Sequence, residues 1–134
     1  TFASGEIAIR VFSFLNDDEN QDLQLPKLEQ LNTEYDYKFL TTENYQKEFQ
    51  NLYTEYEQRH QNNNAQAKRI FAIYKGLEKA KNFFKEESYS MSKEGEKFYT
   101  MLENGNAYNI HSIAEVRQPS ILYKKIFKLS IFTP

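Results

Sequence analysis

Four side chains near the N-terminus have types and a spacing suited to binding calcium. Asp18, Asn20, Asp22 and Glu29 fall at the first, third, fifth and twelfth positions of a segment that begins at Asp18. Calcium prefers six to eight oxygen ligands, and carboxylate or amide oxygens at these positions supply them in known calcium loops. These four residues are therefore the candidate metal ligands of the chain, with calcium as the candidate ion.

The segment from Asn16 to Glu29 resembles an EF-hand loop, with departures from the pattern in either alignment. When the loop begins at Asp18, Leu23 stands where glycine is expected and Pro26 takes a ligand position. When it begins at Asn16, Lys27 replaces the bidentate acid. The simpler interpretation, which we favour, is an acidic and solvated loop between two elements, over about residues 16–24. Calcium-linked regulation is the alternative.

A second resemblance involves residues 45–102, which carry aromatic side chains in an order similar to that of cysteine-peptidase propeptide inhibitors. The run Arg69-Ile70-Phe71 matches part of the pattern on the second helix of that family. Tyr74 and Glu78 depart from it, because the family has Asn and Ile at those positions. The resemblance implies a helical hairpin that inhibits a papain-like enzyme, and it defines a further alternative function.

The C-terminal segment from Ile121 to Phe132 alternates large apolar side chains with lysines. As a helix it would be amphipathic and basic, a pattern typical of elements that dock on a partner or lie on a membrane surface. The alternative is a last core element with solvated lysines. The candidate partner-binding residues are Tyr123, Lys124, Lys125, Phe127 and Lys128.

No catalytic residues can be assigned from motifs. The two histidines, His60 and His111, have no second histidine at helical spacing, and the four glycines form neither a nucleophile elbow nor a phosphate-binding loop. The chain has no cysteine, which excludes disulfides, thiolate metal sites and cysteine nucleophiles. We therefore favour a protein that is not an enzyme, and we expect no cofactor other than the calcium considered above.

Composition limits the class of protein and partner. The 134 residues suit a single domain, and a net charge of −2 gives no general attraction to nucleic acid. No apolar run approaches the roughly 20 residues that cross a bilayer. No secretory signal is visible, and a chain that starts with Thr1 is consistent with a removed leader. We favour an intracellular or organellar compartment.

Hydrophobic periodicity predicts the elements that would position these residues. Residues 42–61 place Tyr45, Phe49, Leu52, Tyr53 and Tyr56 on one helical face. A second helix is predicted over 65–86, and a third over about 93–103, with Ser92 as its N-cap and Asn104-Gly105 as its end. Residues 35–40 alternate like a short strand. Residues 6–15 fit a helix or a strand, and we favour the helix.

The predicted fold class is mainly α: a helical hairpin plus a third helix, with irregular ends that add at most a small sheet. An α+β fold is the alternative. We expect a single domain over 1–134, with an N-terminal region at 1–41, a helical core at 42–104 and a C-terminal extension at 105–134. The 16% of aromatic residues exceed what such helices would bury, and interfaces favour these rings. The predicted function is a non-catalytic protein–protein interaction module, an accessory subunit of a larger assembly.

Overall fold

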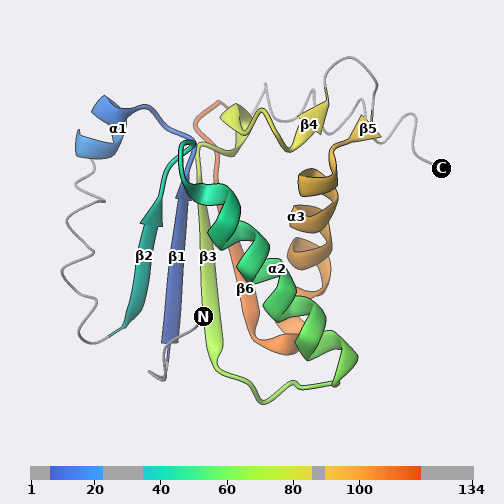
Figure 1. Cartoon of the computed structure of the whole chain (residues 1–134). Coiled ribbons are helices and arrows are strands. Elements are labelled where there is room, and N and C mark those ends of the chain that lie inside the picture. The colour runs from blue at the N-terminus through green and yellow to red at the C-terminus, as the bar shows by residue number, and fades with distance from the viewer. Residues whose placement is uncertain (1–6, 23–34, 86–89, 119–134) are drawn as a thin grey trace.

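A parallel four-stranded sheet is the centre of the protein, as Figure 1 shows. The computed structural model describes residues 7–22, 35–85 and 90–118. In chain order the elements are β1 (Ile7–Ser13), α1 (Asp17–Asp22), β2 (Asp36–Leu40), α2 (Tyr45–Gln61), β3 (Arg69–Lys75), the 3₁₀ turn η2 (Leu77–Lys79), β4 (Phe84–Lys85), β5 (Ser90–Met91), α3 (Lys93–Asn104), the 3₁₀ turn η3 (Gly105–Tyr108) and β6 (Ile110–Glu115).

The strand order is β2-β1-β3-β6, and every pair in this sheet is parallel. The short strands β4 and β5 form a separate antiparallel pair. After β1 the chain moves to one side to form β2, and then crosses β1 to form β3 on its other side. The strand order therefore reverses between β1 and β3, as in doubly wound α/β folds.

Two helices cover one face of the sheet. Figure 1 shows α2 crossing in front of the strands, with α3 next to it on the side of β6. Their buried residues pack on the inward positions of the sheet in one core cluster, which contains Phe12, Ile70 and Tyr74 from the strands. On the opposite face, Val11, Tyr37 and Phe39 are buried in a second, smaller cluster. Parallel sheets are typically buried on both faces, but the second face of this sheet is buried only in part, since Ile113 on β6 is 50% exposed.

The prediction of a mainly α fold with a helical core at 42–104 is therefore wrong, and the protein is an α/β protein. The second predicted helix, at 65–86, is overturned by β3 and the turn η2. In β3, Ile70, Ala72 and Tyr74 are buried while the residues between them are partly exposed, which is the period of a strand. Gly76 ends the strand with φ +68°, a left-handed conformation that glycine adopts easily.

Residues 7–13 form a strand and not the helix that we favoured for 6–15. The loop predicted at 16–24 is also wrong in part, because residues 17–22 form the helix α1. Asn16 and Glu19 form a reciprocal capping box at the start of α1: the Glu19 amide donates to Asn16 Oδ1 (2.8 Å), and the Asn16 amide donates to Glu19 Oε1 (3.2 Å).

Three predicted elements are confirmed. The helix predicted at 42–61 corresponds to α2, and the strand predicted at 35–40 corresponds to β2. The third predicted helix corresponds to α3, where the Ser92 hydroxyl accepts a hydrogen bond from the Gly95 amide (3.0 Å). Among the described residues, no helix has both the length and the apolar character needed to cross a bilayer.

The aromatic residues are used mainly to build the core. Tyr74 illustrates this, with its ring centroid 5.2 Å from that of Phe12 and 4.8 Å from that of Phe98. Among the described residues, only Tyr35, Leu102 and Ile113 are large hydrophobic side chains that are exposed. Within the described part of the chain, most of the aromatic surplus expected at a surface is therefore taken up in the core.

Candidate functional site

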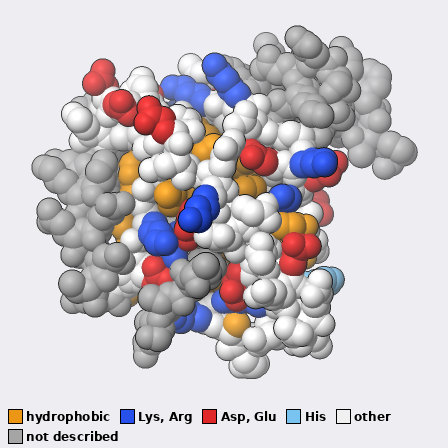
Figure 2. Space-filling model, viewed as in Figure 1, with side chains coloured by type: hydrophobic (Ala, Val, Ile, Leu, Met, Phe, Trp, Pro, Cys, Tyr) orange, Lys and Arg blue, Asp and Glu red, His pale blue; other side chains and the backbone are white. Residues whose placement is uncertain are grey.

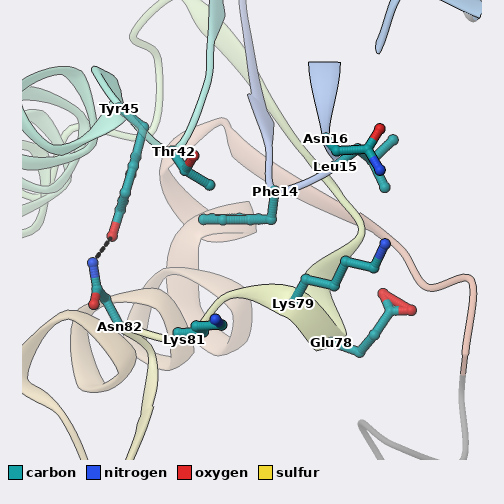
Figure 3. A pocket seen from close by; sticks show the side chains of 9 residues that line it. All are labelled: Phe14, Leu15, Asn16, Thr42, Tyr45, Glu78, Lys79, Lys81 and Asn82. Atoms are coloured by element: carbon teal, nitrogen blue, oxygen red, sulfur yellow. Dashed lines mark hydrogen bonds between the residues drawn. The ribbon is translucent and has the colours of Figure 1, made fainter. Parts of the chain in front are cut away.

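A crevice opens beyond the carboxyl ends of the central strands. It is formed by the segment after β1, the segment after β2 and the start of α2, and the segment that includes η2 after β3. Its volume is about 600 Å³. The lining residues, drawn in Figure 3, are Phe14, Leu15, Asn16, Thr42, Tyr45, Glu78, Lys79, Lys81 and Asn82.

The topology explains why a cavity forms here. Because the strand order reverses between β1 and β3, the segments leaving these neighbouring strands diverge and leave a space between them. Open α/β sheets bind their ligands at this kind of position, outside the carboxyl ends of the strands. The crevice is therefore the first place to look for a functional site in this fold.

The floor of the crevice is apolar and firmly held. The Phe14 ring contacts Tyr45 and Phe83 edge to face, with 5.4 Å between centroids in each case. The Phe14 amide donates to the Lys75 carbonyl (2.9 Å), which extends the pairing of β1 with β3 by one residue. Leu15, next in the chain, is 4% exposed. The floor can therefore accept the apolar part of a ligand without rearranging.

One wall contains a chain of hydrogen bonds that joins three segments. Asn82 Nδ2 donates to the Tyr45 hydroxyl (3.1 Å), and this hydroxyl donates to Glu94 Oε2 (2.8 Å) on α3. Burial, together with the neighbouring Glu94 carboxylate, raises the pKa of Tyr45 to about 12. Tyr45 is therefore protonated at neutral pH and acts as a fixed donor to Glu94.

Two lysines, Lys79 and Lys81, also line the crevice. In Figure 3, Lys79 lies on the side of Phe14 opposite to Tyr45, and Lys81 lies below Phe14. Lys79 Nζ is 3.1 Å from Glu19 Oε1 and is 42% exposed. Lys81 is exposed, and its ammonium has no hydrogen-bond or ion-pair partner among the residues that the structure describes. Asn16 and Thr42 add exposed polar groups to the edge of the crevice. The edge therefore offers positive charge and hydrogen-bonding groups.

Glu78 also lines the crevice, but its carboxylate is bound to another part of the chain. Its carboxylate accepts hydrogen bonds from the backbone amides of Arg117 (3.1 Å) and Gln118 (2.6 Å), and Glu78 is 2% exposed. In Figure 3 the carboxylate points away from Phe14 and toward the chain that follows β6. Glu78 holds that chain in place, and Lys79 and Lys81 are the two cationic side chains that line the crevice.

The structure describes three of the four candidate calcium ligands, all on α1, and it does not bring the side chains of Asp18 and Asn20 together. Asp18 is exposed on α1, whereas Asn20 is buried and its side chain bonds to the Ser13 hydroxyl (2.5 Å) and the Leu15 carbonyl (3.4 Å). Asp22 ends α1, and Glu29 lies outside the described residues. The described part of the chain holds no group of three acidic or histidine side chains that could bind a metal. Calcium binding by this set stays a prediction.

The other sequence candidates also lie away from the crevice or outside the described part of the chain. Tyr123, Lys124, Lys125, Phe127 and Lys128 all lie outside the described residues, so their role stays a prediction.

The remaining candidates are placed by the structure. The run Arg69–Phe71 belongs to β3, so the helical hairpin implied by the propeptide resemblance is not formed. His60 Nδ1 is 3.0 Å from the Tyr108 hydroxyl, and His111 Nδ1 is 2.7 Å from Asn106 Oδ1.

Sequence reasoning missed the crevice because its residues come from three separate segments. Tyr45 was assigned only to a helical stripe, and Lys79 and Lys81 were placed inside a predicted helix. A usable signal was present at Gly76, where a glycine follows an apolar run that also fits a buried strand. The topology that joins the segments has no such local signal.

No family model matches the sequence, and neither a curated protein nor a solved structure is significantly similar to the chain. The function is therefore inferred from the geometry of this protein alone.

Proposed function

We propose that the chain is a ligand-binding domain that holds a small anionic molecule in the crevice beyond β1 and β3. The observation that carries this proposal is the position of the cavity at the reversal of strand order, where open α/β sheets bind their ligands. The volume of about 600 Å³ lies within the range of about 300–1,000 Å³ that is usual for small-molecule pockets.

The lining supports an anion with an apolar part. Lys81 is a cation without a described partner, and Lys79 can share its ammonium between Glu19 and a ligand. Phosphate and carboxylate groups accept charge-assisted hydrogen bonds from lysines. The Phe14 ring and Leu15 give the apolar portion of a ligand a surface to pack on. Charges of both signs are interspersed on the face seen in Figure 2, so selectivity must come from such local groups.

The proposal can be tested by thermal shift and titration calorimetry with a defined set of probes: inorganic phosphate, citrate, adenosine monophosphate and uncharged adenosine. We expect at least one anion to raise the melting temperature, and adenosine to do so less than its monophosphate. Lys81→Gln should weaken binding by about fivefold, the effect of roughly 1 kcal/mol for a solvent-exposed charge.

The matched control is Arg69→Gln, which also removes one exposed positive charge. Arg69 begins β3, at the other end of the sheet, roughly 20 Å away along a seven-residue strand. The control should bind the anions as the wild type does. The proposal fails if no anion stabilises the protein, or if both substitutions weaken binding equally.

We also propose, as a second candidate, that the chain is a protein–protein interaction module and an accessory subunit. The observation in favour of it is Ile113, which is 50% exposed on β6, the last strand of the described sheet. A partner strand can add to such an edge, and an apolar side chain there would pack on it. The C-terminal residues Tyr123 to Lys128 remain proposed partner contacts.

This second proposal predicts slower amide hydrogen exchange over 110–115 when a partner isolated from the native source is added. The Ile113→Lys variant should bind that partner more weakly than the wild type. Unchanged exchange over 110–115 in a complex that forms with equal affinity would contradict an interface on β6.

A further inference from the structure

We propose that a second binding site, for an organic cation, lies between the C-terminal ends of α2 and α3. A cavity of about 380 Å³ opens there, lined by Tyr56, His60, Glu103, Asn104, Ala107 and Tyr108. Figure 1 shows both helices ending at the side of the molecule where the strands begin, opposite to the crevice. The site is separate from the crevice and does not depend on the function proposed for it.

Three rings form two walls that meet at a right angle. Tyr56 and His60 lie one turn apart on α2, with rings 10° from parallel and centroids 6.0 Å apart. The Tyr108 ring stands at 77° to Tyr56 and 87° to His60, with centroids 6.0 and 5.5 Å away. The contact of 3.0 Å between His60 Nδ1 and the Tyr108 hydroxyl joins the walls. A cation placed within about 6 Å of such ring faces is attracted by their electron density.

The charges around the cavity favour a cation. Glu103, in the last turn of α3, is exposed and has no ion-pair partner among the residues that the structure describes. The last turn of α3 contains no basic residue. The carbonyl ends of helices carry partial negative charge, and Asn104, the last residue of α3, lines this cavity.

Two basic residues, Arg59 and His60, lie in the last turn of α2, and the Arg59 guanidinium is already paired with an acid. Arg59, in the last turn of α2, is 4% exposed, and its Nε lies 2.8 Å from Glu55 Oε2. Its Nη1 donates to the carbonyls of Lys68 and Tyr108, each at 2.8 Å. Arg59 therefore fastens η3 to α2 and is not among the residues that line the cavity.

The same row of rings already binds a cation at its other end. The ring of Tyr53 lies 5.9 Å from that of Tyr56, and Lys97 Nζ lies 5.4 Å from the centroid of Tyr53. At the Tyr108 end the lining of the cavity includes an acid, Glu103, but no lysine or arginine. An alkylammonium group would supply the missing charge. It could come from a free small molecule or from a lysine side chain of a protein.

Amide NMR of the full chain tests the inference, with tetramethylammonium chloride as the probe and sodium chloride as the control for ionic strength. We expect saturable shifts confined to the residues around Tyr56, His60, Glu103 and Tyr108. Glu103→Gln should weaken binding by about threefold or more, as expected for an exposed ion pair of roughly 0.7 kcal/mol. Glu43→Gln, an exposed acid preceding the N-terminal end of α2, should leave it unchanged.

Comparison of choline with N-acetyl-trimethyllysine methyl ester identifies the source of the cation. Tighter binding of choline supports a free small cation, and tighter binding of the lysine derivative supports a protein side chain; each result supports the site. Shifts that do not saturate, or equal effects of Glu103→Gln and Glu43→Gln, would overturn it. Because Glu103 is exposed, its substitution should leave the spectrum otherwise unchanged, so loss of binding cannot be attributed to unfolding.

Discussion

Replacing Arg10 by methionine should destabilise the protein strongly, because Arg10 is the centre of a buried ion network. Arg10 is fully buried on β1. Its Nε lies 2.8 Å from Glu48 Oε1 on α2, and its Nη2 lies 3.0 Å from Asp36 Oδ2 on β2. Nη1 donates to the Asp36 carbonyl (2.6 Å). One guanidinium therefore connects the sheet to the helix that covers it.

The magnitude follows from what the substitution leaves behind. Without Arg10, the carboxylates of Asp36 and Glu48 stay buried, with side chains only 7% and 8% exposed. Lys38 compensates weakly, because its Nζ is 3.4 Å from Glu48 Oε2 and its side chain is 46% exposed. Removing one partner of a buried ion pair typically costs 3–5 kcal/mol, so we expect a loss of about 4 kcal/mol. This is a large part of the roughly 5–15 kcal/mol that stabilises a typical domain.

Urea denaturation followed by circular dichroism measures this loss as a lower midpoint with an unchanged slope. The triple variant Arg10→Met, Asp36→Asn, Glu48→Gln removes the uncompensated charges and should recover at least about half of the lost stability. Arg69→Met, at an exposed position of β3, should change the free energy of unfolding by less than about 0.5 kcal/mol. A loss below about 1 kcal/mol for Arg10→Met, or a triple variant no more stable than the single one, would refute the argument.

Two further predictions concern the packing of α3 and the capping of α1. In Gly95→Ala the new Cβ would lie 2.0 Å from the Phe83 carbonyl oxygen, so α3 must move. Although alanine raises the helix propensity by about 1 kcal/mol, we expect urea denaturation to show a net loss of at least about 2 kcal/mol in the free energy of unfolding. A variant as stable as the wild type would contradict this contact. The hydrogen bond from the Asn16 amide, followed by the interaction with Lys79, lowers the pKa of Glu19. Glu19 therefore contributes stability above its unfolded pKa that is lost as pH falls through its folded pKa. Glu19→Gln should lower the melting temperature at pH 7 more than at pH 3, and an equal effect at both would count against the lowered pKa.

The elements that could be predicted are those with strong local signals. The helix α2 was predicted because its apolar residues recur at helical spacing over several turns, from Tyr45 to Tyr56. The helix α3 was predicted from its ends, since Ser92 caps it and Gly105 follows it. Strand β2 was predicted from the alternation in residues 36–40. In each case the nearest neighbours in the sequence determine the structure.

The central strands could not be assigned because their environment is non-local. β1 and β3 lie between other strands and carry apolar side chains on both of their faces, so their sequences are nearly continuous apolar runs. Ile70 and Tyr74 fit both a helical stripe and one face of a strand. Only the pairing of β3 with β1 and β6 decides between them.

The acidic segment shows how one pattern supports two structures. Asn16 and Glu19 have the spacing of a capping box, which predicts a helix start, but the density of acids around them also resembles a calcium loop. In the structure this segment forms the helix α1, and the buried Asn20 side chain accepts a hydrogen bond from the Ser13 hydroxyl. Asn16, Glu19 and Asn20 each make a side-chain hydrogen bond within this part of the chain.

The aromatic content, taken from the sequence as a sign of an interface, instead explains the rigidity of the two candidate sites. Rings such as Phe49 and Phe98 are enclosed in the core, so their number says little about the surface. These ring contacts continue outward to Phe14 at one end of the sheet, and a second group of rings, Tyr56, His60 and Tyr108, lies at the other end. Each site is thus built on side chains that are already fixed by packing, which lowers the entropy lost when a ligand binds. The charged groups differ between the two ends: Lys79, Lys81 and Glu78 line the first site, whereas Glu103 and the C-terminal end of α3 line the second together with His60.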